Sequence, residues 1–145
     1  MIGASDNQGD PRVRRALEQL ECPYDVDADG DFKITVRLTE DRTQLVLINS
    51  NTESFAGMEI REVYSFGYIE DREPDAQLLK WLLLENGAVK FGAWRLIESK
   101  NGQVGVAFAA HIAASPDAKM LDSIIDVVAA KADDFEKKTS GADDY

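Results

Sequence analysis

Hydrophobic positions recur along the chain with two periods, one of three to four residues and one of two, and the period changes at polar turns. The longer period predicts three helices, at residues 10–21, 75–86 and 115–138. The shorter period and brief apolar runs predict five strands, at residues 32–38, 44–48, 58–69, 89–98 and 103–113. Helix, three strands, helix, two strands, helix is the order of an α+β domain.

The turns between the predicted strands are short, so neighbouring strands are expected to pair antiparallel. Asn101-Gly102 is the strongest hairpin signal in the chain. Residues 49–57 are rich in Asn and Ser and predict a loop. In the strand that follows, Tyr64 and Phe66 alternate with polar residues such as Arg61. We therefore predict a twisted, five-stranded antiparallel sheet with its helices packed largely on one face.

Short polar motifs mark the ends of the predicted helices. Asp10-Pro11 and Ser115-Pro116 each place a capping oxygen before a proline, which is typical of a helix start. Asn86-Gly87 predicts a left-handed C-cap at the end of the middle helix.

The middle helix has more apolar surface than one core requires. At about 100° per residue it carries one continuous apolar stripe, made of Ala76, Leu78, Leu79, Leu82 and Leu83. Trp81 and Leu84 fall outside this stripe. Two large apolar side chains there predict a second burying surface, either elsewhere in the same domain or on another chain. Trp81 and Leu84 are therefore candidate partner-binding residues.

The last predicted strand has one face of nearly all small residues: Gly105, Ala107, Ala109, His111 and Ala113. Small side chains let a helix or another chain approach a strand closely, so Gly105, Ala107, Ala109 and His111 are also candidate partner-binding residues. His111 is the only histidine, and no GxSxG, HExxH or paired-acid motif accompanies it. A structural or surface histidine is thus favoured over a catalytic one, and no catalytic residue is predicted.

The turn that begins Asp25-Val-Asp27-Ala-Asp29-Gly30 resembles the first half of an EF-hand calcium loop. The bidentate acid that such a loop needs at its twelfth position is replaced by Val36. A polar turn in which Gly30 supplies a positive φ angle is therefore favoured over weak calcium binding, and no metal or cofactor is predicted.

Composition and charge indicate the number of domains, the cellular compartment and the class of partner. At 145 residues the chain predicts one domain at 10–138, with a loose tail at 1–9 and an acidic tail at 139–145. The single cysteine, the lack of an apolar run after a basic start and the lack of a 20-residue apolar segment predict a cytoplasmic protein without a membrane span. A net charge of −11 repels phosphate backbones, so nucleic acid is not an expected partner.

Several motifs together resemble the YbjN-like domain, also called the bacterial sensory transduction regulator family, which shares the fold of type III secretion chaperones. The resemblance spans residues 10–138. It rests on Tyr24 with the turn Asp27-Ala-Asp29-Gly30-Asp31, on Leu78-Leu79-x-x-Leu82-Leu83-x-x-Asn86 followed by Phe91-Gly92, on Gly102, and on Ala129-Ala130-x-Ala132-Asp133-x-x-Glu136.

The resemblance implies a non-enzymatic binding or regulatory module that forms a homodimer. In the secretion chaperones, an extended segment of a client protein is held against helix and sheet surfaces, and this is the alternative function that the resemblance implies. The Asp-rich turn and the tyrosine-rich, charged strand at residues 58–69 are more similar to the YbjN branch.

Overall fold

Three helices and a seven-stranded antiparallel sheet make up residues 8–140 and 145, the part of the chain that the structure, a computed structural model, describes. The helices are α1 Pro11–Gln19, α2 Ala76–Ala88 and α3 Ala118–Thr139. The strands are β1 Asp25–Val26, β2 Phe32–Arg37, β3 Thr43–Ile48, β4 Glu53–Phe55, β5 Met58–Glu70, β6 Ala93–Glu98 and β7 Val104–Ala113. The predicted α+β class and the antiparallel pairing are confirmed.

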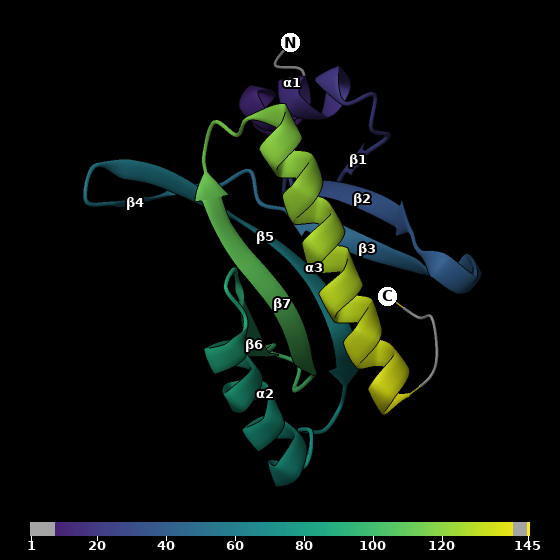
Figure 1. Cartoon of the computed structure of the whole chain (residues 1–145). Helices are drawn as coiled ribbons and strands as arrows, with labels where there is room; N and C mark the ends of the chain where they lie inside the picture. Colours follow the sequence, from purple (N-terminus) through teal and green to yellow (C-terminus); the bar gives the residue numbers. More distant parts are fainter. Residues whose placement is uncertain (1–7, 141–144) are drawn as a thin grey trace.

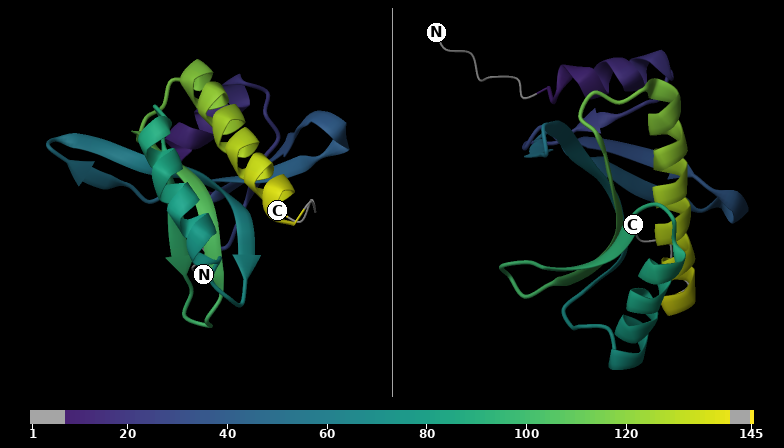
Figure 2. Two further views of the ribbon diagram at one scale, coloured as in Figure 1. Left: turned by 60° about the horizontal axis from the view of Figure 1, so that its bottom comes forward. Right: turned by 60° about the vertical axis from the view of Figure 1, so that its left-hand side comes forward.

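The strands lie in the order β1-β2-β3-β5-β7-β6, and β4 pairs with the start of β5. α3 runs across one face of the sheet, α2 lies beside β6, and α1 packs near the start of α3 (Figure 1). Further views show α2 and α3 on the same side of the sheet, which curves away from them (Figure 2). The helices therefore cover one face, as predicted.

The sheet has two strands more than predicted. β1 pairs with β2 directly after α1. β4 lies inside the predicted loop at 49–57 and forms a hairpin with β5 around Ala56 and Gly57, whose φ angles are 50° and 80°. That loop prediction is wrong in part, because a two-residue turn with positive φ angles closes a tight hairpin.

Acidic side chains cap the helices at their first turns. Asp10 caps α1 as predicted, accepting the Arg12 N–H at 2.9 Å. The cap of α3 is Asp117 rather than the predicted Ser115, and its carboxylate accepts the Met120 N–H at 3.0 Å.

The predicted tails fall mainly outside the described residues, since 1–7 and 141–144 are not described. Gly9 lies so close to the Phe32 ring that a Cβ atom there would be 2.6 Å from it. Thr139 is the last residue of α3, and the Tyr145 hydroxyl hydrogen-bonds the N–H and the carbonyl of Ile69, each at 3.0 Å.

The core lies between α3 and the sheet. The stripe of α3 that faces the sheet is buried, and it consists of Leu121, Ile124, Ile125, Val128, Ala132 and Phe135. On β5, Gly67 lets the helix come close, because a Cβ atom there would lie 2.6 Å from the Ala132 carbonyl oxygen. A side chain at Gly67 would therefore push α3 off the sheet.

The buried face of β5 is the one that contains polar residues. Arg61, Val63 and Ser65 are buried, whereas Tyr64 and Phe66 are only half-buried. The Ser65 hydroxyl donates to the Leu45 carbonyl at 2.6 Å, so its burial leaves no unpaired donor. Tyr64 and Phe66 lie on the face that carries no helix, with their rings edge to face at 5.7 Å.

Arg61 is the largest fully buried side chain and joins three segments. Its guanidinium donates to the Ala114 carbonyl at 2.6 and 2.8 Å and to the Asn49 and Ser50 carbonyls at 2.9 Å each. It also donates to the Asp10 carboxylate at 2.7 Å. One side chain thus ties the start of α1, the loop after β3 and the segment after β7 together.

Asp10 and Glu59 extend this network to the surface through Arg12. Hydrogen bonds from Arg12 hold the pKa of Asp10 well below its ordinary value of 3.8. Hydrogen bonds from Arg12, and then from Thr52, lower the pKa of Glu59 from 4.5 to about 2. Both carboxylates therefore stay ionised in the folded state at a pH where the unfolded chain already binds protons.

This difference predicts that stability is present above about pH 4.5 and is lost as the pH falls toward about 2. We expect the urea midpoint of the wild type to fall across this range. In an Asp10→Asn variant the fall should be shallower, because one of the two depressed carboxyl groups is gone. Equal slopes of midpoint against pH for the two proteins would contradict the prediction.

A second polar cluster attaches the C-terminal part of α3 to the residue before β3. Arg42 Nε lies 2.7 Å from Asp133 Oδ1, and Arg42 Nη2 lies 3.1 Å from Glu136 Oε1. The Asp133 and Glu136 side chains are 5% and 0% exposed. Both carboxylates are thus held by an arginine that directly precedes β3.

Candidate functional site

α2 is rotated relative to the predicted stripe. Leu82 is its buried residue, and Trp81 is half-buried against the core. Leu83, predicted to face the core, is 73% exposed, and Ala76 is exposed as well. The assignment of those two residues to the core stripe is wrong.

Aromatic packing accounts for this rotation. The Trp81 ring stacks on Phe135 of α3 with centroids 6.1 Å apart, and it meets Trp94 of β6 at 6.5 Å. Trp94 in turn contacts Phe108 at 5.2 Å. Aromatic side chains bury more area than leucine does, so the helix turns Trp81 inward and leaves Leu83 outside. Of the two interpretations of Trp81, the structure places it in packing within its own domain.

The outward side of α2 and the neighbouring strand form an apolar surface. Leu83, Leu84 and Leu96 are 73%, 66% and 42% exposed. Between α2 and β6 lies a cavity of about 240 Å³, lined by Leu79, Leu82, Leu83, Asn86, Trp94, Arg95 and Leu96. We call Leu83, Leu84, Leu96 and this cavity the α2–β6 surface. Leu84 is the predicted partner-binding residue that belongs to it.

Asn86 connects α2 to the free edge of β6. Its amide accepts the Trp94 N–H at 2.6 Å and donates to the Trp94 carbonyl at 3.2 Å, as a neighbouring strand would. This bond pair, together with a helix that continues through Gly87 to Ala88, replaces the predicted C-cap, and β6 begins only at Ala93 instead of residue 89.

Beyond Asn86 the edge of β6 is open. β6 is the last strand of the sheet among the described residues. In an antiparallel pair, backbone groups of alternate residues point outward, so Leu96 directs its N–H and carbonyl away from β7 as Trp94 does. The α2–β6 surface therefore offers both apolar side chains and unpaired strand groups.

The predicted small-residue face of β7 is covered by side chains of the neighbouring strand, β5. Ala107 and Ala109 are 0% and 4% exposed, opposite Phe66 and Tyr64 of β5. A Cβ atom on Gly105 would lie 2.6 Å from the Phe66 ring. The small residues thus leave room for the aromatic side chains of the neighbouring strand.

His111 lies at the exposed end of the same face. Its Nε2 is 3.4 Å from Glu62 Oε2, and Arg95 of β6 binds the same carboxylate. The His111 side chain is 52% exposed. These three side chains form a polar cluster that is open to solvent. The predicted partner-binding residues Trp81, Leu84 and those of β7 therefore do not form one site.

Two carboxylates of the Asp-rich turn accept hydrogen bonds from backbone N–H groups. Asp27 accepts the N–H groups of Asp29 and Asp31 at 2.9 and 3.0 Å, and Asp31 accepts the Ser50 N–H at 2.9 Å. Gly30 has a φ angle of 86°, as the polar-turn interpretation predicts. Within residues 8–140 and 145, no group of three His, Cys, Asp or Glu residues is arranged to hold a metal ion.

No protein-family model and no curated protein matches the chain. In the described part of the chain, none of the helices is both long and apolar enough to cross a membrane. Function must therefore be inferred from the surfaces of the molecule itself.

Proposed function

We propose that the chain is a non-enzymatic protein-binding or regulatory module of the YbjN type, which acts in the cytoplasm as a homodimer. The exposed Leu83, Leu84 and Leu96 beside the open edge of β6 carry this proposal. Apolar side chains next to unpaired strand groups are what a partner strand or a second copy can cover.

In the proposed dimer, α2 and β6 of one copy lie against the same elements of the other. A two-fold axis makes such an interface self-complementary, so one apolar patch suffices. The mixed charges of β6, Arg95 and Glu98, would lie at its rim. Leu84 would be at the centre, because α2 exposes it without any role in the core of its own domain.

We expect Leu84→Glu to weaken the dimer by about 100-fold or more, because an unpaired carboxylate would be buried in the interface. Molar mass measured by light scattering over a dilution series should show a wild-type dimer and a monomeric variant. The urea midpoint should stay unchanged, because Leu84 is 66% exposed in one chain.

Val127→Glu on α3 is the matched control. Val127 is also an exposed aliphatic residue of a helix, at 42%, but it lies outside the α2–β6 surface, so the variant should remain dimeric. A monomeric wild type at about 100 μM, or a Leu84→Glu variant that still dimerises, would refute the proposed interface.

The second candidate function is that of a chaperone for a secreted client. It is favoured by the open edge of β6 beside the apolar cavity, which fits an extended segment that places one apolar side chain in the cavity. One stoichiometric, secreted protein bound to the wild type in its native host, and absent from Leu84→Glu, would favour this function over the regulatory one.

A further inference from the structure

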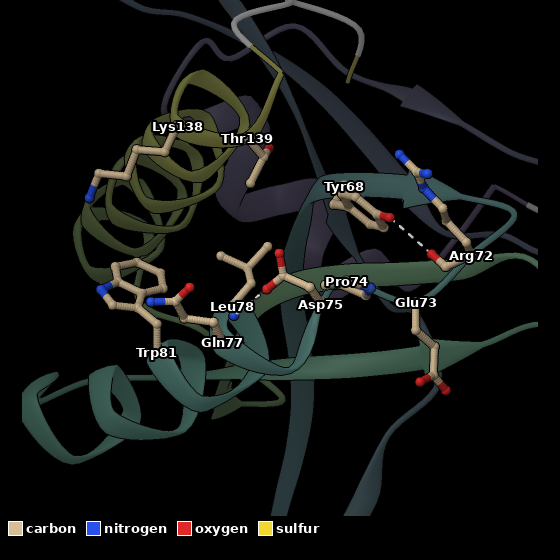
Figure 3. A pocket seen from close by; sticks show the side chains of 10 residues that line it. All are labelled: Tyr68, Arg72, Glu73, Pro74, Asp75, Gln77, Leu78, Trp81, Lys138 and Thr139. Carbon is tan, nitrogen blue, oxygen red and sulfur yellow. Dashed lines mark hydrogen bonds between the residues drawn. The ribbon is translucent and has the colours of Figure 1, made fainter.

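A larger cleft lies on the other side of α2, between its first two turns and the end of α3. Its volume is about 740 Å³, within the range of small-molecule sites. Figure 3 shows the residues that line it: Tyr68, Arg72, Glu73, Pro74, Asp75, Gln77, Leu78, Trp81, Lys138 and Thr139. None of them belongs to the α2–β6 surface, so this cleft is a separate site.

The floor of the cleft is apolar and aromatic. Leu78 and Trp81 come from α2 and Tyr68 from the end of β5, and all three are half-buried. Trp81 is held in place by its stacking on Phe135, and the Tyr68 hydroxyl is fixed by donating to the Arg72 carbonyl at 2.9 Å. A flat apolar group can therefore bind against these side chains without the entropy cost of ordering them.

One wall of the cleft carries a positive charge that pairs with no carboxylate of residues 8–140 and 145. The Lys138 ammonium lies 4.9 Å from the centre of the Trp81 ring, and it forms no ion pair with another described residue. The neighbouring lysine, Lys137, is by contrast paired with Glu40 at 3.3 Å.

The acidic residues of the cleft do not cancel this charge. The Asp75 carboxylate accepts the Leu78 N–H at 2.8 Å as the cap of α2. The Glu73 side chain points away from the other lining residues (Figure 3). The charged group beside Trp81 is thus the Lys138 ammonium, and the neutral Gln77 amide lies next to the same ring (Figure 3).

We propose that this cleft binds a small ligand that joins a flat apolar group to a carboxylate. The apolar group lies on Trp81 and Leu78, and the carboxylate pairs with Lys138. A charge-assisted hydrogen bond at the end of an apolar floor fixes the direction of such a ligand. Free aromatic acids and the carboxyl end of a polypeptide with an apolar last residue share this chemistry.

The test titrates the ¹⁵N-labelled full chain with 1-naphthoate and follows the two tryptophan indole N–H signals, which a Trp81→Phe variant assigns. We expect a saturable shift of the Trp81 signal with a dissociation constant of about 1 mM, typical of a ligand of this size. Lys138→Gln should weaken binding about fivefold, the upper range for a partly exposed ion pair.

Lys119→Gln, at the opposite end of α3, is the control and should bind 1-naphthoate as the wild type does. The uncharged 1-naphthalenemethanol should bind the wild type about as weakly as 1-naphthoate binds Lys138→Gln. Equal affinity for the two ligands, or no shift of the Trp81 signal at about 10 mM, would overturn the proposal.

Two further ligands identify the source of the carboxylate. Acetyl-Ala-Ala-Phe with a free carboxyl end is compared with the same peptide amidated. Tighter binding of the free peptide than of 1-naphthoate would assign the cleft to chain ends, and the reverse order would assign it to free acids. Equal binding of the free and the amidated peptide would again contradict a carboxylate site.

Discussion

Replacing Arg61 by methionine is expected to lower the free energy of unfolding by about 3 to 5 kcal/mol. The loss has two causes. The buried carbonyl of Ala114 and the partly buried carbonyls of Asn49 and Ser50 would lose their donor, and the Asp10 carboxylate would lose the cation on its buried side. Urea unfolding monitored by far-ultraviolet circular dichroism measures the effect as a lower midpoint at an unchanged slope.

Arg12→Met is the matched control for this experiment. Arg12 binds the same carboxylate of Asp10 at 2.8 Å, but its side chain is 30% exposed. Solvent screens such a pair, so the variant should lose no more than about 1 kcal/mol. Similar losses for Arg12→Met and Arg61→Met would show that burial of Arg61 is not what makes it important.

Arg61 also illustrates where sequence reasoning stops. The alternation of β5 suggests that its more apolar side, with Tyr64 and Phe66, is the buried one, yet α3 covers the side with Arg61 and Ser65. Arginine is almost never buried unless it is paired, and its partners here come from positions 11 to 53 residues away in the chain. No local pattern contains that information.

The order of the elements could be predicted because it depends on local periodicity. α1, β2, β3 and β7 begin and end within a few residues of the predicted limits, because their caps, turns and alternation are all local. β1 and β4 were missed because two or three residues are too few to show a period.

The candidate site could be predicted only in part. Three consecutive leucines, residues 82–84, cannot all face one core, so an exposed leucine on α2 was foreseeable. Which of them is exposed depends on how Trp81 packs against Phe135, a contact between distant elements. Leu96 and the open edge of β6 depend on strand order, which the sequence does not reveal.

Arg42, whose side chain is 11% exposed, should be as important as Arg61. Replacing it by methionine would leave two buried carboxylates, those of Asp133 and Glu136, without the guanidinium that now pairs with both. We expect the free energy of unfolding to fall by about 3 to 5 kcal/mol. The same urea experiment measures it, and a loss below about 1 kcal/mol would contradict the prediction.

Two controls separate charge from packing at this cluster. Lys137→Met removes a cation that is 33% exposed and 4.0 Å from Asp133, and it should cost no more than about 1 kcal/mol. The triple variant Arg42→Met, Asp133→Leu, Glu136→Leu removes all three charges and should recover most of the loss, because an apolar cluster of similar volume has no desolvation penalty. If the triple variant is as unstable as Arg42→Met, the loss comes from the packing of the Arg42 stem rather than from the lost ion pairs. That result would make β3 and α3 an apolar junction to which the ion pairs contribute little.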